Sequence, residues 1–260
     1  MPKMNQKKRL YTKKGNSWRD KHIGREVGVD VISVIMGSML GDTHLEKRKG
    51  GIGTRIKFEQ SNKNVEYLMW YYKYFADRGY CNPEKPKLRV RIAKNNKVNY
   101  TYRLNSYTLN SLNWIHEMFY KDGKKRVPKN IGEYLTPLGL AVWIMGDGSK
   151  LGVGLKIATN SFLNEDIKIL REVLKWKYNL DTIIHSDTAS DSITVNNRFG
   201  SHHSSYMREN GMTNNSATLR TANKLLRNKG YTIYLNRENK QNLYKIVEPY
   251  ILPSMVYKFK

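Results

Sequence analysis

The sequence has one cysteine, few acidic residues and no long apolar run. The lone cysteine, Cys81, cannot form a disulfide within the chain or build a cysteine metal cluster, which fits a reducing compartment. A membrane-spanning helix needs about 18 uninterrupted apolar residues. The most apolar stretch, residues 29–40, is shorter and contains Asp30. We therefore expect no membrane segment, and no signal peptide, because no apolar core lies near the start.

Acidic residues are scarce relative to basic ones. The 260 residues include 46 Lys and Arg against 22 Asp and Glu, a formal net charge of +24. Such an excess implies a polyanionic partner, and nucleic acid is the first candidate. A hydrophobic content of 39% is enough for a packed core, which excludes a disordered chain. Abundant Lys, Asn, Tyr and Ile have AT-rich codons and hint at an organellar genome.

One short pattern occurs twice, about a hundred residues apart. It reads IMGSMLGDT at residues 35–43 and LAVWIMGDG at residues 140–148, so each copy predicts an apolar helix that closes on an aspartate, Asp42 or Asp147. A single repetition over half a chain indicates two copies of one compact unit. Small residues inside both runs would let the two helix backbones approach closely: Gly37, Ser38, Gly41, Ala141 and Gly146.

The position of the two aspartates is electrostatically unusual. A helix ends in a partial negative charge, so a carboxylate in its last turn is disfavoured by up to about 1 kcal/mol. The same cost occurring twice predicts a positive group beside both helix ends, and a divalent metal is the simplest candidate. Adjacent carboxylates suit Mg²⁺ or Ca²⁺, and pairs of metals serve phosphodiester hydrolysis. The alternative is a pair of buried helices with polar last residues, which leaves the matched pattern unexplained.

Alternating residues in the first half predict strands with one basic face. Residues 54–60 place Arg55, Lys57 and Glu59 on one face, and residues 87–94 and 98–106 form a hairpin that turns at Asn95-Asn96. The polar face of the hairpin carries Lys87, Arg89, Arg91, Asn99, Thr101, Arg103 and Asn105. The other face is apolar, as expected for an antiparallel sheet with one face solvated and the other packed on the core. Arginine suits guanine and asparagine suits adenine. Because the hairpin strands lack Asp and Glu, we favour DNA contact over an ordinary solvated sheet face.

Two further segments stand apart from this pattern. Residues 1–27 form a basic arm, for which a solvated tail without a role is the alternative. In the second half, the strand at 151–159 has Lys156 as its only charge, and residues 187–229 form a polar insertion between strands 182–185 and 231–235. We expect His202-His203 within that insertion to lie in an exposed loop rather than at a metal site.

The two runs resemble the signature of the LAGLIDADG homing endonucleases, with Asp42 and Asp147 at the acidic position. The flanking segments FEQSNKNVEYL, KKRVP and PYILPSMVYKF also resemble the monomeric, intron-encoded branch of that family, over residues 29–259. Thr43 replaces the final glycine of the first copy, and glycine precedes both aspartates.

The resemblance implies an α/β fold of two pseudo-symmetric αββαββα units, packed through the two motif helices. The repeats would span residues 28–130 and 131–260. Each would carry a twisted antiparallel sheet, and the two sheets would form a basic saddle over a long, asymmetric DNA duplex. A chain holding both repeats need not dimerise, so we expect a monomer.

The resemblance also implies a metal-dependent endonuclease. Mg²⁺ would be held by Asp42 and Asp147, with the carbonyl groups of Gly41 and Gly146. Lys125 and Lys258 would polarise water or stabilise the transition state. Gln60 and Asn160, which correspond to one another in the two halves, would orient water, with Glu59 and Thr159 less favoured. Ca²⁺ would support binding without cleavage, and Mn²⁺ is the alternative catalytic metal. The product would be a double-strand break with 3′ overhangs, serving group I intron mobility in a mitochondrion or, alternatively, a chloroplast.

Two other functions remain open at this stage. An intron-encoded maturase would use the same fold and basic surface to bind intron RNA and assist splicing. The large insertion at 187–229 is the reason to retain this alternative. A DNA-binding regulator without catalysis would not explain two helix-terminal carboxylates. No histidine spacing of the HNH type and no GIY-YIG strand pattern occurs, so these other nuclease chemistries are disfavoured.

Overall fold

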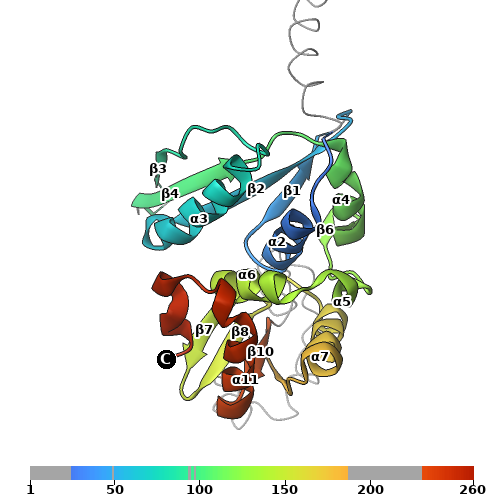
Figure 1. The fold of residues 1–260 in the computed structure, drawn as a ribbon, viewed down its shortest axis with the longest axis vertical. Coiled ribbons are helices and arrows are strands. Elements are labelled where there is room, and N and C mark those ends of the chain that lie inside the picture. Colours follow the sequence, from blue (N-terminus) through green and yellow to red (C-terminus); the bar gives the residue numbers. More distant parts are fainter. Residues whose placement is uncertain (1–24, 49, 93–94, 97, 187–229) are drawn as a thin grey trace, which may run out of the picture.

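The computed structural model describes residues 25–48, 50–92, 95–96, 98–186 and 230–260. Most of the expected basic arm and the whole insertion at 187–229, including His202-His203, lie outside these residues. Two similar halves follow one another along the chain, and their helices α2 (Val29–Met39) and α6 (Pro137–Asp147) lie side by side at the centre (Figure 1). Within the described residues, no helix is both long and apolar enough to span a membrane.

The elements of the halves follow the same order. After α2 the first half has β1 (His44–Lys47), β2 (Thr54–Ser61), α3 (Val65–Ala76), β3 (Leu88–Ile92), β4 (Val98–Asn105), α4 (Asn113–Phe119), β5 (Tyr120–Lys121) and β6 (Lys124–Lys125). The short α5 (Ile131–Tyr134) leads to α6, and then come β7 (Gly148–Leu151), β8 (Gly154–Ala158), α7 (Asn164–Tyr178), β9 (Ile183–Ser186), β10 (Tyr231–Leu235) and α11 (Arg237–Val247). Short 3₁₀ turns η1 (Asn62–Asn64), η2 (Asn110–Leu112), η3 (Glu248–Tyr250) and η4 (Pro253–Lys258) complete the described chain.

Each half carries one four-stranded antiparallel sheet. The strand orders are β1-β2-β4-β3 and β7-β8-β10-β9, so the second sheet repeats the first. This confirms the expected α/β fold with two antiparallel sheets flanked by helices. The sequence patterns did not identify β1 and β7, because each strand is only four residues long and too short to display a periodicity.

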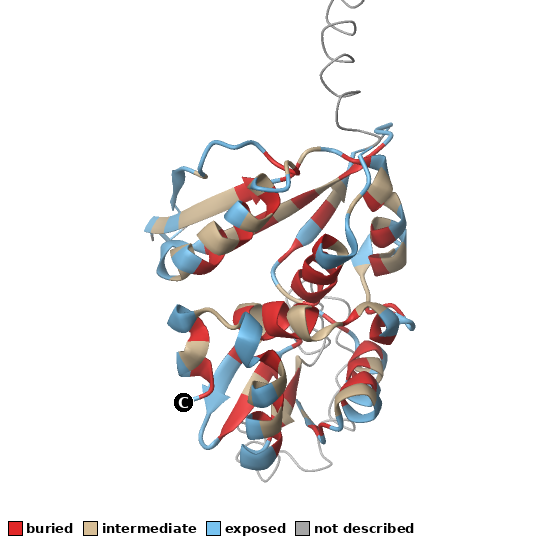
Figure 2. Ribbon diagram, viewed as in Figure 1, coloured by how far each residue is buried: buried red, intermediate tan, exposed pale blue. Residues whose placement is uncertain are grey.

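The central helices approach closely because glycines face one another. A Cβ atom added to Gly37 of α2 would lie 1.9 Å from the carbonyl oxygen of Gly139 in α6, and one added to Gly139 would lie 2.8 Å from the carbonyl oxygen of Ser33. Thr136 caps the start of α6 by accepting a hydrogen bond from Gly139 N, with Pro137 in the first turn. Buried residues therefore fill both helices at the junction (Figure 2).

The first sheet packs its inner face against α3 through aromatic rings. Phe58 of β2 stacks on Tyr71 of α3 with 4.3 Å between ring centroids, and Tyr71 stacks on Phe75 at 4.7 Å. The burial of β2 alternates along the strand, as its sequence predicts. This packing turns Arg55 and Lys57 away from α3 and toward the opposite face of the sheet.

The expected apolar face of the hairpin is only partly covered. All of β3 is exposed, and Leu88, Val90 and Ile92 keep 49%, 61% and 68% of their surface accessible. The strand alternation is present, but the prediction that its apolar side packs inward is wrong for β3. The reason is topological, because β3 is the edge strand and the residues that pack against α3 come from β2 and β4.

Candidate functional site

The two aspartates meet at the ends of the central helices. Asp147 is the last residue of α6, whereas Asp42 lies in the turn between α2 and β1. A Cβ atom added to Gly41 would lie 3.1 Å from Oδ2 of Asp147, and one added to Gly146 would lie 4.0 Å from Oδ2 of Asp42. The glycine before each aspartate thus leaves room for the carboxylate of the other half. This explains why glycine precedes both aspartates, which the sequence pattern alone did not explain.

Burial and the charge of Asp42 act on the carboxylate of Asp147. The pKa of Asp147 is raised to about 7, first by burial and then by the charge of Asp42, although Lys125 and Lys258 oppose the shift. A carboxylate such as Asp147 that is costly to ionise without a further cation, placed beside a second carboxylate, fits a hard divalent metal such as Mg²⁺. Within the described residues no group of three or more His, Cys, Asp or Glu side chains could hold a metal. The remaining coordination would therefore come from carbonyl groups, water and a bound phosphate.

Two lysines supply positive charge at the helix ends. Nζ of Lys125 donates to the carbonyl oxygens of Gly41 at 2.8 Å and Thr43 at 3.0 Å. Nζ of Lys258 donates to the carbonyl oxygen of Met145 at 2.6 Å, with Gly146 at 3.4 Å. Burial lowers the pKa of each lysine to about 8, although both aspartates act to raise it. Each ammonium therefore offsets part of the helix-end charge that the sequence predicted a metal would offset.

The carbonyl groups expected to bind a metal are therefore already in use. Gly41 and Gly146 both accept hydrogen bonds from lysine ammonium groups. A carbonyl oxygen has two lone pairs, so this arrangement leaves one acceptor direction for another ligand. The role of the two carbonyl groups as metal ligands stays a prediction.

Tight local turns place both lysines. Lys125 is in the β5–β6 ribbon, whose turn residues Asp122 and Gly123 both have positive φ, 52° and 71°. That conformation suits the Asp-Gly pair of a tight hairpin. Lys258 ends η4, which starts at Pro253 and folds the terminal segment back onto α6.

Gln60 contacts the first aspartate directly. Its Nε2 donates to Oδ2 of Asp42 at 2.6 Å, and its Oε1 accepts from Nδ2 of Asn64 at 3.2 Å, which fixes the orientation of the amide. Gln60 is buried, with 6% of its surface exposed. A water-orienting role for Gln60 stays a prediction, and its position is compatible with it.

The second half places a different residue at the matching position. His44, two residues after Asp42, pairs with Lys57, and Ser149, two residues after Asp147, pairs with Lys156. Counting from these pairs, Gln60 corresponds to Thr159, which is buried, and Ser61 corresponds to the exposed Asn160. The expected correspondence of Asn160 with Gln60 is wrong by one residue, and a shift of one residue moves a strand side chain to the other face. Thr159 Oγ1 donates to the carbonyl oxygen of Tyr231 at 2.6 Å.

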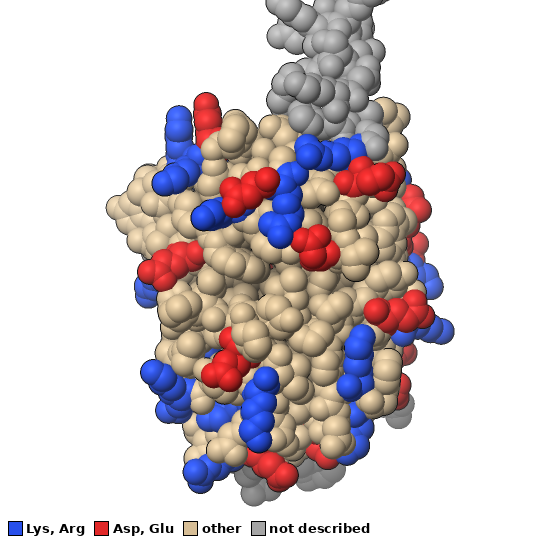
Figure 3. All heavy atoms as spheres, viewed as in Figure 1, with Lys and Arg blue, Asp and Glu red and all other residues tan. Residues whose placement is uncertain are grey.

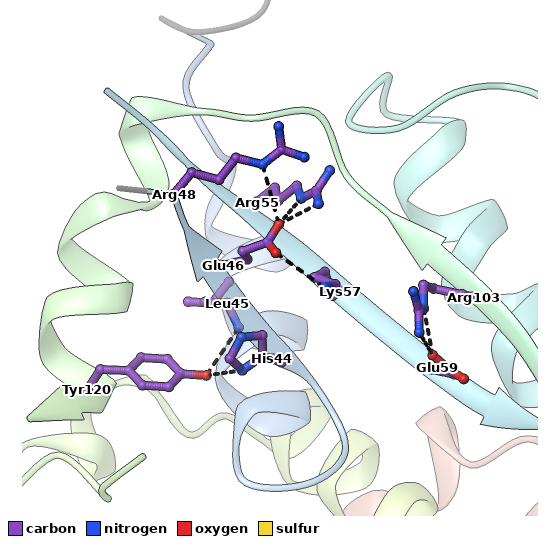
Figure 4. Close-up of polar contacts among 9 residues, drawn as sticks. All are labelled: His44, Leu45, Glu46, Arg48, Arg55, Lys57, Glu59, Arg103 and Tyr120. Carbon is purple, nitrogen blue, oxygen red and sulfur yellow. Dashed lines mark hydrogen bonds and ion pairs between the residues drawn. The ribbon is translucent and has the colours of Figure 1, made fainter. Parts of the chain in front are cut away.

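The face of the first sheet predicted to contact DNA carries acidic as well as basic side chains (Figure 4). Cross-strand register places Glu46 opposite Arg55 and Glu59 opposite Arg103. The side chains expected on this face do share it, although Lys87 comes just before β3, and they include Arg89, Arg91, Asn99, Thr101 and Asn105. Sequence reasoning missed Glu46, because it belongs to the short strand β1.

His44 is another residue of this face that the sequence did not single out. Its Nδ1 lies 2.8 Å from the hydroxyl of Tyr120, and that hydroxyl also accepts from Leu45 N at 3.3 Å (Figure 4). The hydroxyl proton is then free for Nδ1, which leaves the proton of a neutral His44 on Nε2. Burial lowers the pKa of His44, and the charges of Lys57 and Lys125 lower it further.

The face of the second sheet that carries Lys156 is less charged than the matching face of the first sheet, which carries Arg55 and Glu59. We call these two matching faces the outer faces of the sheets. Register pairs Ser149, Lys156 and Tyr234 across β7, β8 and β10. Tyr234 stacks on His185 at 5.2 Å between ring centroids, and the apolar side chains of Leu151 and Ile183 are exposed. No Asp or Glu occurs in these four strands. In the view of Figure 3, which shows one face of the molecule, basic and acidic side chains are interspersed over both halves.

Comparison with known proteins identifies relatives whose similarity extends over both halves of the chain. The model of the LAGLIDADG DNA endonuclease family matches residues 32–203. The cytochrome b mRNA maturase bI2 of Saccharomyces cerevisiae is 36% identical over 94% of this chain, which spans about half (51%) of that relative. The Debaryomyces hansenii protein of the same name is 35% identical, over 88% of this chain and 73% of its own length. The intron-encoded endonuclease ai4 of Dictyostelium discoideum is 30% identical over 72% of this chain and 96% of its own.

A solved structure has the same fold. The homing endonuclease I-WcaI, bound to its DNA recognition sequence, superposes with a TM-score of 0.69 at 20% identity and covers 100% of this chain and 95% of that chain. The matched region includes both halves and both aspartates. The chain therefore belongs to the LAGLIDADG homing endonuclease family, in the intron-encoded type that carries both repeats in one polypeptide.

Proposed function

We propose that the protein is a site-specific DNA endonuclease that cuts both strands of a long, asymmetric duplex. The observation that carries this proposal is the meeting of Asp42 and Asp147 at the helix junction, where Gly41 lies against the carboxylate of Asp147. Two lysines at the same helix ends complete a centre with approximate twofold symmetry. This arrangement suits two related hydrolyses, one on each strand of a duplex.

Bound Mg²⁺ would supply an activated water and stabilise negative charge on the phosphate. The residues that would hold it are Asp42 and Asp147, with the carbonyl groups of Gly41 and Gly146. Gln60 fixes the carboxylate of Asp42 through its hydrogen bond and leaves the other oxygen, Oδ1, for a ligand. Lys125 and Lys258 would stabilise charge that develops on phosphate oxygens, because their ammonium groups lie beside both carboxylates.

The two sheets would bind the major groove on either side of the cut. Their polar faces differ in sequence, so the target would be asymmetric, and contacts to several phosphates would make affinity fall steeply with salt. DNA binding of this chain is supported by its likeness to I-WcaI, which is bound to its recognition sequence. One chain supplies both halves, so a monomer is sufficient.

The biological setting that fits is the mobility of a group I intron. Relatives include an intron-encoded endonuclease and proteins named for cytochrome b mRNA, and these names support an organellar location, with mitochondria favoured. We propose a double-strand break with 3′ overhangs, Mg²⁺ or Mn²⁺ as the catalytic metal, and Ca²⁺ as a metal that permits binding without cleavage.

Cleavage of duplexes that carry the uninterrupted host-gene junction tests the proposal. The wild type should cut both strands in Mg²⁺, and Asp42→Asn and Asp147→Asn should each reduce double-strand cutting by about 10³-fold or more while DNA binding in Ca²⁺ persists. Binding by the wild type without cutting in Mg²⁺ or Mn²⁺ would rule out the endonuclease.

The second candidate function is an RNA maturase. Two relatives that cover most of this chain are named cytochrome b mRNA maturases, and this specific similarity favours intron RNA as an alternative partner. Binding of the host intron RNA, followed by splicing assays with and without the protein, distinguishes the functions. Asp42→Asn should leave RNA-assisted splicing intact if both activities exist, because splicing would not use the carboxylate pair.

A further inference from the structure

Two arginine–glutamate pairs repeat one geometry on the outer face of the first sheet. Nε of Arg103 donates to Oε2 of Glu59 at 2.6 Å, and Nη2 of the same arginine contacts the same oxygen. Arg55 contacts Oε2 of Glu46 through the same two nitrogens, Nε and Nη2. Both pairs join neighbouring strands, and Figure 4 shows the two carboxylates among the basic side chains of the sheet.

Both carboxylates are themselves occupied by cations and hydroxyl groups. Oε1 of Glu46 accepts from Nζ of Lys57 at 3.3 Å, and Nε of Arg48 lies 3.9 Å from Oε2. The hydrogen bond from Arg55 lowers the pKa of Glu46 more than any other contact. Burial acts to raise the pKa of Glu59, but hydrogen bonds from Arg103 and Thr101 leave it lowered. Both glutamates are therefore ionised, and their carboxylate oxygens accept hydrogen bonds from side chains of the same sheet.

The contacts leave a defined part of each arginine free. A guanidinium has five N–H donors, and the carboxylate takes the Nε edge together with one hydrogen of Nη2. The remaining hydrogens of Nη1 and Nη2 point away from the glutamate as a fork. A fork of this kind matches the O6 and N7 acceptors of guanine in the major groove. The side chains of Arg55 and Arg103 are only 24% and 28% exposed, so the pairs hold the fork in place before DNA arrives.

The charge balance separates base reading from phosphate binding. The Arg103–Glu59 pair carries little net charge, so it attracts phosphate weakly and its fixed geometry becomes its main contribution. Glu46 also contacts Lys57 and Arg48, so the cluster around Arg55 keeps a net positive charge. Arg91 on β3 differs, because it is exposed and forms no ion pair with a carboxylate among the residues that the structure describes. It is suited to phosphate, where a mobile full charge is enough.

We propose that Glu46 and Glu59 are specificity-determining residues that hold Arg55 and Arg103 for bidentate contact with guanine in one half of the target. The inference rests on the proposed DNA-binding function and adds a base identity to it. The second sheet has no equivalent: register places Leu151 and Gly154 where the first sheet has Glu46 and Arg55, and Ala158 and Thr232 where it has Glu59 and Arg103. The guanine contacts of Arg55 and Arg103 should therefore fall in the part of the target that the first sheet binds.

Selection of bound duplexes from a randomised library in Ca²⁺, with the full chain, provides the test. The wild type should enrich guanine at a fixed position for each arginine. Glu59→Gln should reduce the guanine preference at one of these positions by about 10-fold, while overall DNA affinity rises and becomes more salt-dependent, because a freed arginine adds net positive charge. A role in folding alone would lower affinity and preference together.

Matched variants keep the result interpretable. Arg103→Gln should remove the same guanine preference, and replacement of that guanine by 7-deazaguanine should weaken the wild type about 10-fold but affect Glu59→Gln little. Arg91→Gln should lower affinity evenly across sequences and reduce the salt slope by about 1. Thermal unfolding of each variant confirms that it is folded.

Each outcome bears on a separate claim. If the wild type enriches no sequence, the proposed DNA-binding function fails. If the wild type enriches a sequence and Glu59→Gln keeps the same preference, the proposal that Glu59 holds Arg103 for guanine is overturned, while DNA binding stands. Persistence of the preference in Arg103→Gln would also overturn the inference, because the glutamate itself would then read cytosine on the opposite strand.

Discussion

The two halves agree at the centre of the molecule and differ at its outer faces. Each half contributes an aspartate, a lysine that contacts the end of a motif helix, and a glycine that admits the carboxylate of the other half. On the outer faces, the first sheet has paired arginines and glutamates, whereas the second has Lys156, Tyr234 and exposed apolar side chains. Hydrolysis of two strands requires similar chemistry twice, but recognition of an asymmetric site requires two different surfaces.

The pair of lysines gives the most severe test of the symmetric centre. Lys125→Met and Lys258→Met should each slow double-strand cutting by about 10²- to 10³-fold, because each removes a positive charge beside both carboxylates. Single-turnover cleavage in Mg²⁺ measures the loss. Thermal unfolding should show little destabilisation. Burial removes water from each ammonium group and lowers its pKa to about 8, so replacing the charge with an apolar side chain relieves a desolvation penalty. Undiminished cutting by either variant would show that the two halves do not share this chemistry.

The mismatch between Gln60 and Thr159 predicts unequal treatment of the two strands. Gln60→Ala should reduce cutting of one strand by about 10²-fold, because Asp42 loses the amide that orients it. Thr159→Ala should change cutting by less than about 3-fold, because the threonine hydroxyl is bound to a carbonyl group and not to Asp147. Strand-specific labels at the two 5′ ends separate the effects. Equal losses in both strands would mean that Gln60 supports the whole centre rather than one half.

The raised pKa of Asp147 predicts that the metal-free centre destabilises the fold. The carboxyl group of an unfolded Asp has a pKa near 3.8, but the pKa of the folded Asp147 is about 7, so the folded state keeps the proton to higher pH. Stability of the wild type should therefore fall as pH rises from about 4 to about 7. Asp147→Asn lacks this penalty, so it should exceed the wild type by about 2 kcal/mol at pH 7.5 in chelator, and the difference should shrink toward pH 4.

Chemical denaturation across this pH range measures the difference. Added Mg²⁺ or Ca²⁺ should stabilise the wild type more than Asp147→Asn, because binding to the folded state alone adds stability. Asp42→Asn serves as the matched variant, since it removes the neighbouring charge and should lower the pKa of Asp147. A pH-independent difference between Asp147→Asn and the wild type would show that the carboxylate is not strained by its surroundings.

The sequence predicted the central residues better than their partners. The repeated motif located Asp42 and Asp147, and strand alternation located the basic face, because both features follow from local spacing. The partner of Arg55 could not be found in the same way, because Glu46 lies on a four-residue strand and reaches the arginine only through sheet pairing. Asn160 was matched to Gln60 in place of Thr159, an error of one residue, because β8 has no marker of register in its sequence.

Packing across the centre was also only partly visible in the sequence. Small residues predicted a close approach of the motif helices, but the tightest contact is between Gly37 and Gly139, and Gly139 was not singled out. The exposed apolar side of β3 depends on which strands reach α3, a tertiary property that alternation does not contain. Local sequence patterns thus determine which residues share a face of the sheet, whereas the order of the strands determines which helices pack on that face.

The two central glycines offer the finest comparison of the halves. A methyl group at Gly41 would lie 3.1 Å from Oδ2 of Asp147, whereas one at Gly146 would lie 4.0 Å from Oδ2 of Asp42. Gly41→Ala should therefore displace a carboxylate and weaken Ca²⁺-dependent stabilisation by about 1 kcal/mol, while Gly146→Ala should fit within ordinary contact distance. Thermal unfolding with and without Ca²⁺ measures both. If the two variants respond alike, the centre adjusts as a symmetric unit, and the differences between the halves are confined to the surfaces that contact the target.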